Sequence, residues 1–425
     1  MPADRLAATI DKARPTRRFG GGSSPPSRTP ATPLEMLLLQ RFLEMMGTPP
    51  IQFVLWNGAT VGDPVGDPGA RLHLQNRRDL WRLLTGPSVF FGDAYVDGAV
   101  DLVGDLVAFL ESTYRALPRQ ADLGVLRKLA PWLQRPRPNT LAGSRRNIHH
   151  HYDIGNHFYR LWLDEQMQYT CAYFPDPSLG LEQAQRAKLD HVCRKLRLKP
   201  GDSVVEAGCG WGGLALHMAR HYGARVRAFN ISHEQVSFAR ERARAEGLQQ
   251  QVEYVEDDYR NISGQYDVFA SVGMLEHVGV EHYGELGEVI HRSLKSDGRG
   301  LIHSIGRNRP ARMNAWIERR IFPGAQPPSL GEMMQIFEPR AFSVLDVENL
   351  RLHYAVTLTH WLERFERHAE PIAAMYDATF VRAWRLYLAG SIAAFRTGEL
   401  QLFQVVFARP KDNHIPWSRS HLYRD

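Results

Sequence analysis

Glycines crowd the short segment after a buried, β-branched run, and their spacing could hold a ligand. The segment reads VVEAGCGWGG at 204–213, and a carboxylate, Glu206, stands two residues before the first glycine. Glycine permits a tight turn and lets a ligand approach the backbone closely. A helix is expected from Leu214 onward. This strand–turn–helix predicts a nucleotide-type site at the carboxyl edge of a parallel sheet. Its glycines are Gly208, Gly210, Gly212 and Gly213.

Two cofactors are compatible with this turn. The G-x-G-x-x-G spacing that begins at Gly208 satisfies the dinucleotide pattern, but a nicotinamide site also needs an acidic residue after the next strand. That strand is expected at 225–229, and the residue at its tip is Asn230. S-adenosylmethionine has no pyrophosphate, and its cationic groups suit an acidic edge such as Glu206. The pattern therefore favours S-adenosylmethionine.

The elements that must position this turn alternate between strands and helices. This order predicts an α/β fold, a doubly wound Rossmann-like sheet with helices between the strands. A segment at 316–368, before the last strand, is expected to shape a substrate pocket. The predicted strands are 203–207, 225–229, 252–255, 267–272, 299–303, 342–348 and 402–409.

Changes in composition divide the chain. Residues 1–32 are rich in Pro, Gly, Ser and Arg and are predicted to form a disordered tail. Residues 33–117 are predicted to form a smaller N-terminal α/β domain, with a glycine-punctuated turn at 91–101. A linker at 118–146, a catalytic domain at 147–410 and a tail at 411–425 complete the division.

The linker is strongly basic. Seven basic residues and one acid lie between Arg119 and Arg146, and Val125, Leu126, Leu129, Trp132 and Leu133 share one helical face. Such a helix could lie on an anionic bilayer or pack on a neighbouring domain, and we favour the second interpretation. The triplet His149–His151 has no further ligands at zinc spacing, so no metal site is expected.

Bulk properties narrow the class of protein. The 425 residues are 44% hydrophobic, enough for two domains, and no apolar stretch reaches the ~18 residues of a membrane helix. The net charge of +6 suits an anionic partner, and without a nucleic-acid motif we expect a membrane surface rather than nucleic acid. Three scattered cysteines indicate a reducing compartment. The expected location is the cytoplasm, peripheral on the inner face of the membrane.

Many motifs in one order resemble a known family. From about 91 to 410 the chain resembles the cyclopropane-fatty-acyl-phospholipid synthases and mycolic acid cyclopropane synthases, within the class I S-adenosylmethionine methyltransferases. The earlier GDAYVDG at 92–98 resembles the small N-terminal, lipid-binding-type domain of the phospholipid-acting members. The markers are HHYDIGNHFYRLWLD (150–164), QYTCAYF (168–174), EAGCGWGG (206–213), NISHEQ (230–235), SVGMLEHVG (271–279), LIHSIG (301–306), HYAVTLTHWLERF (353–365) and QLFQVVFAR (401–409).

The resemblance implies two groups of site residues. The first would bind S-adenosylmethionine, and the second matches positions that hold a bicarbonate ion in the synthases. The cofactor group, with the residues of the glycine turn, is Tyr169, Thr170, Glu206, Gly208, Gly210, Gly213, Asn230, Gln235, Tyr259 and Arg260. The bicarbonate group is Cys171, Glu276, His303, Ile305 and Tyr354.

The implied reaction transfers a methylene from S-adenosylmethionine to the cis double bond of an unsaturated phospholipid acyl chain. A cation on the chain needs π faces, for which Tyr169, Tyr173, Phe174, Tyr354 and Trp361 are available. A bound bicarbonate would remove the proton. The resemblance also implies a homodimer. Alternatives are a methyl-branched or methylene product, N-methylation of a small amine, and a non-catalytic lipid-binding module.

Overall fold

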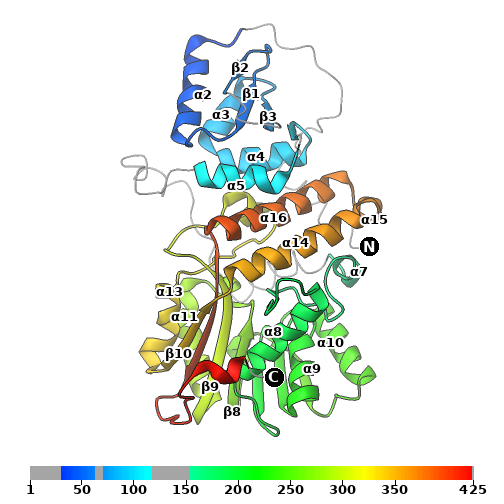
Figure 1. Ribbon diagram of the computed structural model, residues 1–425, viewed down its shortest axis with the longest axis vertical. Helices are drawn as coiled ribbons and strands as arrows, with labels where there is room; N and C mark the ends of the chain where they lie inside the picture. The colour runs from blue at the N-terminus through cyan, green and yellow to red at the C-terminus, as the bar shows by residue number, and fades with distance from the viewer. Residues whose placement is uncertain (1–29, 63–69, 103, 117–153, 424–425) are drawn as a thin grey trace.

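The computed structural model describes residues 30–62, 70–102, 104–116 and 154–423. Two sheets organise these ranges, a small one near the N-terminus and a large one in the rest of the chain (Figure 1). The predicted basic helix of the linker, the triplet His149–His151 and almost all of the predicted N-terminal tail lie outside the described residues.

The large sheet has seven strands in the order β10-β11-β9-β8-β5-β6-β7. Strands β5 to β9 run parallel, while β11 is antiparallel to β9 and β10 is antiparallel to β11. This confirms the predicted Rossmann-like α/β fold, and every predicted strand is present. The strands are β5 Ser203–Ala207, β6 Arg225–Asn230, β7 Val252–Glu256, β8 Tyr266–Val272, β9 Leu294–Gly306, β10 Ser343–Asn349 and β11 Gln401–Ala408.

Helices cover both faces of this sheet because its strands carry apolar side chains on both sides. One face packs against α8 (Leu181–Lys195), α9 (Gly213–Tyr222) and α10 (His233–Ala245). The other face packs against α11 (Tyr283–Ser293) and α13 (Leu330–Phe337). Single-turn helices at Tyr259–Asn261, Leu275–His277, Val280–His282 and Glu338–Arg340 connect these elements.

A helical layer lies over the carboxyl ends of the parallel strands, between the two sheets (Figure 1). It consists of α14 (Arg351–Arg367), α15 (Ala369–Met375) and α16 (Ala378–Thr397), with the short helices α7 (Asn156–Arg160) and α12 (Ala315–Arg320) beside it. The segment expected at 316–368 is thus longer than predicted, because α16 continues it to residue 397 and β10 interrupts it.

The small sheet has the order β2-β1-β3-β4, with β1 and β3 parallel. The predicted turn at 91–101 is wrong in part: α4 continues as a helix through Gly92 to Val96, because Phe90, Ala94 and Tyr95 are buried on one side of it. The elements are α2 Pro33–Met45, β1 Ile51–Val54, β2 Thr60–Val61, β3 Ala70–His73, α3 Arg77–Thr85, α4 Pro87–Val96, β4 Val100–Leu102 and α5 Leu106–Ala116.

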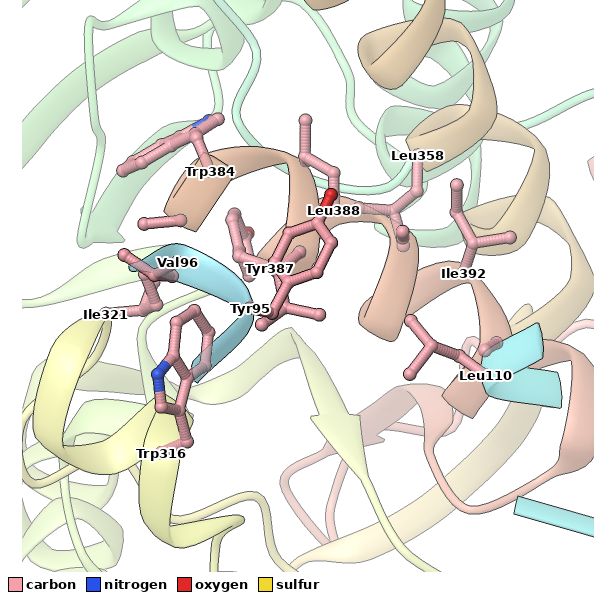
Figure 2. Packing of buried hydrophobic residues seen from close by; sticks show 14 of the residues in the cluster. Tyr95, Val96, Leu110, Trp316, Ile321, Leu358, Trp384, Tyr387, Leu388 and Ile392 are labelled. Atoms are coloured by element: carbon pink, nitrogen blue, oxygen red, sulfur yellow. The ribbon is translucent and has the colours of Figure 1, made fainter. Parts of the chain in front are cut away.

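The two units share one hydrophobic cluster. Figure 2 shows Val96 of α4 close to Ile321 and Tyr95 beside Tyr387, with Leu110 of α5 on the side of Ile392 in α16. Polar contacts frame it: the guanidinium of Arg320 pairs through two nitrogens with Asp93, at 3.1 and 3.0 Å, and Arg382 donates to the carbonyls of Tyr95 and Val100. These contacts therefore hold the helical layer against the N-terminal unit.

Residues after 410 pack beside α8, one of the helices that cover the large sheet. Arg197 pairs with Asp412 at 2.8 Å, and the single turn Arg419–Leu422 lies against α8, where Leu422 is buried. Within the described residues, none of the helices is both long and apolar enough to span a membrane.

Candidate active site

The glycine turn joins β5 to α9 with a backbone that other residues rarely adopt. Gly208, Gly210 and Gly212 have φ values of +83°, +54° and +82°, in the left-handed region that favours glycine. The amides of Gly208 and Cys209 both donate to the carbonyl of Phe229 at the end of β6. A Cβ at Gly210 would meet no atom within 4 Å, so space lies open beside the turn.

That space is a cavity of about 100 Å³ lined by the turn and by neighbouring loops. It brings together seven of the ten residues predicted for the cofactor. Asn230 is held in place because its side-chain amide donates to the carbonyl of Gly210 at 3.2 Å and to Oε1 of Gln235 at 2.7 Å. The seven are Tyr169, Thr170, Glu206, Gly208, Gly210, Asn230 and Gln235.

Two buried titratable side chains lie beneath this cavity. Glu206 and Lys188 are both buried, and burial raises the pKa of Glu206 to about 8 and lowers that of Lys188 to about 8. Nζ of Lys188 donates to Gln168 at 2.6 Å and to Thr170 at 3.0 Å. Oε2 of Glu206 has no hydrogen-bond partner among the described residues. A carboxylate oxygen is thus left for a donor or cation in the cavity.

The predicted cofactor fits these residues on two observations. The unpartnered oxygen of Glu206 can accept from an ammonium group, and the open backbone at Gly210 allows close approach. Tyr169, Thr170, Asn230 and Gln235 supply further polar groups around the same space. The neutral or acidic character of this lining suits a cationic ligand better than a pyrophosphate.

A second, larger cavity of about 330 Å³ adjoins the first. The two share Tyr169, Thr170, Gly273 and His277 in their walls. Most of the second cavity is apolar, and its walls come from β9, from α14 and α16, and from Phe91 and other residues of α4 and α5 in the N-terminal unit. Its shape therefore suits a hydrocarbon group brought next to the first cavity.

All five residues of the predicted bicarbonate group line this second cavity: Cys171, Glu276, His303, Ile305 and Tyr354. Oε1 of Glu276 accepts from the amide of Ile305 at 2.6 Å, while Oε2 is buried without a partner among the described residues. Burial raises the pKa of Glu276 to about 7. Near neutral pH the carboxyl group therefore exchanges a proton readily, which suits an acid–base role.

His303 is neutral and has a defined tautomer. Burial lowers its pKa to about 3. The side-chain amide of Gln404 donates to Nδ1 at 3.0 Å, so we assign the ring proton to Nε2. His303 can thus donate one hydrogen bond from Nε2, and Glu276 can accept one at Oε2. Cys171 is buried, and burial raises the pKa of its thiol, so it acts as a thiol rather than a nucleophilic thiolate.

Some predicted residues lie outside both cavities. Gly213 is behind the first cavity, where a Cβ would lie 2.1 Å from Nε2 of Gln168. Tyr259 and Arg260 pack on each other at 5.0 Å, and Arg260 pairs with Asp258 and Glu285. Their predicted role near an adenine stays a prediction.

Three of the five predicted aromatic residues also lie outside both cavities, among them Trp361, which is fully buried. Tyr173 stacks on His191 at 4.1 Å and on His353 at 5.1 Å, and Phe174 stacks on His360. Neither lines a cavity. Tyr169 and Tyr354 do, so the expectation that Tyr173 and Phe174 supply π faces is wrong for this geometry.

Sequence reasoning missed residues brought in by distant elements. Tyr387 of α16 lines the second cavity, and its hydroxyl lies 2.9 Å from that of Tyr169. Phe91 of the N-terminal unit and Trp316 of α12 also line this cavity. Arg307 could have been found, because it continues the alternation of His303 and Ile305 along β9.

Comparisons with known proteins agree with this geometry. The sequence model of mycolic acid cyclopropane synthetase matches residues 140–405, and that of a domain of unknown function matches 38–119. A probable fatty acid methyltransferase of Pseudomonas putida is 36% identical over 88% of this chain and 96% of its own length. The cyclopropane-fatty-acyl-phospholipid synthase of Escherichia coli K12 is 42% identical over 63% of this chain and 69% of its own.

A solved structure gives the same picture. A mycolic acid cyclopropane synthase in complex with SAH and CTAB superposes with a TM-score of 0.59 at 28% identity, covering 62% of this chain and 98% of its own.

Proposed function

Because the chain belongs to the mycolic acid cyclopropane synthetase family, we propose that it forms cyclopropane rings on unsaturated phospholipids. Membership makes it an S-adenosylmethionine-dependent methyltransferase. The proposal is that a methylene passes from S-adenosylmethionine to the cis double bond of an acyl chain, with bound bicarbonate as the general base. We also propose that the protein acts at an anionic membrane surface and forms a homodimer.

One observation carries this proposal. Cys171, Glu276, His303, Ile305 and Tyr354 meet in the wall of an apolar cavity that adjoins the glycine turn. A hydrocarbon substrate and a polar base would otherwise require separate environments. An apolar cavity with a few convergent polar groups serves both.

The residues would divide the work. When bound, S-adenosylmethionine would supply an electrophilic methyl group and bicarbonate a base. Glu276 and His303 would hold the base through one acceptor and one donor, both fixed by the neighbouring strands. The rings of Tyr169 and Tyr354 would stabilise positive charge on the hydrocarbon by about 0.5–2 kcal/mol. The apolar walls would exclude water from that charge.

The test is incubation with S-adenosylmethionine and vesicles of an unsaturated phospholipid, followed by mass spectrometry and NMR of the acyl chains. The expected product gains one CH₂ group and shows ring protons in place of vinyl protons. A chain that binds S-adenosylmethionine but leaves every lipid unchanged contradicts the proposal.

A matched pair of glycine variants tests the cavity. Gly390 of α16 lines it and Gly331 of α13 does not, and a Cβ at either meets nothing within 4 Å. Gly390→Leu should fill the cavity and lower turnover of long acyl chains while S-adenosylmethionine affinity stays the same. Gly331→Leu should keep both. Equal turnover in the two variants would place the acyl chain elsewhere.

A second candidate is methyl transfer without ring closure, to give a methylene or branched chain. It is favoured by the Pseudomonas putida relative, which matches over almost its whole length and is named a fatty acid methyltransferase. The two outcomes differ in how the cation on the chain is neutralised. The new methyl loses a proton as the ring closes, or a proton leaves without ring closure, after a hydride shift where the product is a methylene. The same NMR measurement separates them, because only the alternative retains vinyl protons or yields a branched methyl signal.

A further inference from the structure

One cationic side chain in the wall of the apolar cavity, that of Arg307, has no role in the proposed chemistry. Arg307 follows the last residue of β9 and lines the second cavity. Its Nε is buried and has no hydrogen-bond partner among the described residues, and a weak contact of 3.9 Å joins Nη2 to the sulfur of Met313. A guanidinium with an unused donor in apolar surroundings needs an acceptor.

The strand register fixes where Arg307 lies. Side chains alternate between the faces of a strand, so His303, Ile305 and Arg307 share one side, and all three line the cavity. Arg307 lies four positions after His303, so their Cα atoms are about 13 Å apart at roughly 3.3 Å per residue. The guanidinium is thus on the same wall as the catalytic group but distant from it.

Arg307 lies toward the open end of the cavity. The exposed residues of the lining are Arg312, Asn314 and Glu399. The phenol of Tyr114, from α5, also lines this cavity, and its pKa is raised by burial. Among the described residues of the lining, Glu399 is the carboxylate at this end, and with Arg307 and Arg312 their local charge balance is positive. The polar rim therefore favours an anion, with Arg307 its most buried cation.

We propose that Arg307 binds the anionic head group of the lipid substrate, the phosphodiester of a phospholipid, at the mouth of the acyl cavity. This inference rests on the proposed function. The planar guanidinium presents paired donors that match phosphate oxygens, and Arg312 adds charge at the exposed rim. Glu399 excludes a second anion and accepts a cationic part of a head group.

The same anchor sets which double bond is reached. An extended chain advances roughly 1.2 Å per bond, judging from the span of extended polypeptide. The Cα separation of about 13 Å between Arg307 and His303 spans on the order of ten bonds of an extended chain, so the double bond that is reached should lie several bonds from the head group. An alkene close to the head group would stop short of the catalytic residues.

The experiment compares two lipids with identical unsaturated chains in mixed micelles: phosphatidylglycerol and the diacylglycerol that lacks phosphate. The wild type should prefer phosphatidylglycerol. Arg307→Gln should raise KM for it by roughly 10- to 100-fold, the value of hydrogen bonds to a charged group. Its S-adenosylmethionine affinity and its rate on diacylglycerol should stay unchanged.

Two variants control for charge and folding. Arg307→Lys keeps the charge without the fork and should retain part of the preference. Arg309 is exposed and lines neither cavity, so Arg309→Gln should behave as wild type. With a mixture of phosphatidylglycerols whose chains carry the double bond at different positions, Arg307→Gln should modify a spread of positions and the wild type a single position.

The outcomes separate the two proposals. An Arg307→Gln protein that keeps the full preference for phosphatidylglycerol overturns the anchor and leaves the proposed function intact. A wild type that modifies neither lipid overturns the proposed function instead. Free unsaturated fatty acid is the third substrate: if its use depends on Arg307 and phosphatidylglycerol is not preferred, the bound anion is a carboxylate and the phosphodiester assignment is wrong.

Discussion

Replacing Glu276 with Gln should make the protein more stable while removing its activity. Burial raises the pKa of this carboxyl group from 4.5 to about 7. Between these values the folded protein keeps a proton that the unfolded chain has lost, so the stability of the wild type falls as the pH rises. At 1.36 kcal/mol per pKa unit, the full loss is about 3 kcal/mol above pH 7.

In Glu276→Gln the pH-dependent loss of stability is absent, and the hydrogen bond to the amide of Ile305 is preserved. Its Oε1 can still accept from the amide of Ile305, and the neutral amide has no charge to bury. The advantage of Glu276→Gln over the wild type should therefore grow by about 2 kcal/mol between about pH 5.5 and pH 8.5. Lipid modification should fall by roughly 10²- to 10⁴-fold, the usual contribution of a general base, because bicarbonate would lose the acceptor that holds it.

The assay is urea unfolding of both proteins across this pH range, with calorimetric titration of S-adenosylmethionine and lipid analysis on the same preparations. The difference between the proteins isolates Glu276, because Glu206 titrates in both. A constant stability difference at all pH values would refute the buried, raised carboxyl. Loss of cofactor binding together with activity would refute its assignment to the base site.

Three further changes test the surroundings of the site. Gly213→Ala should weaken S-adenosylmethionine binding, measured by calorimetry, because its methyl would displace Gln168. Lys188→Met should lower that affinity about tenfold by leaving the acceptors on Gln168 and Thr170 without their donor, and thermal unfolding will tell whether the fold persists. Gly92→Ala places a methyl 2.2 Å from the ring of Trp316, so lipid turnover should fall while calorimetry finds cofactor affinity unchanged; equal loss of both would contradict the division between the two cavities.

Local pattern was sufficient to predict much of the fold. The strand over 203–207 and the turn at Gly208 combine β-branched residues with glycines that need positive φ, and both signals are contained in a few neighbouring residues. α4 was missed because glycines at 92 and 98 look like turn residues. Gly92 instead serves close packing against Trp316, over two hundred residues away in the chain.

Some residues of the candidate site could likewise be predicted from the sequence, and others could not. Glu276 lies in the single turn that follows β8, and His303 and Ile305 lie in the last part of β9. A ligand site is expected at this edge of a parallel sheet, so their meeting could be predicted from resemblance and topology. Tyr387 could not, because nothing local marks which face of α16 reaches Tyr169. Pairings of this kind depend on tertiary packing rather than on any residue's neighbours.

The joint between Gly92 and Trp316 has a consequence for protein engineering. The indole occupies the space where any residue other than glycine at position 92 would carry its β-carbon, so the side chains at the two positions depend on each other. A chimera that grafts the first hundred residues of a relative onto this catalytic half must inherit a glycine at that place. Alternatively, it must exchange the tryptophan for a smaller side chain in the same step.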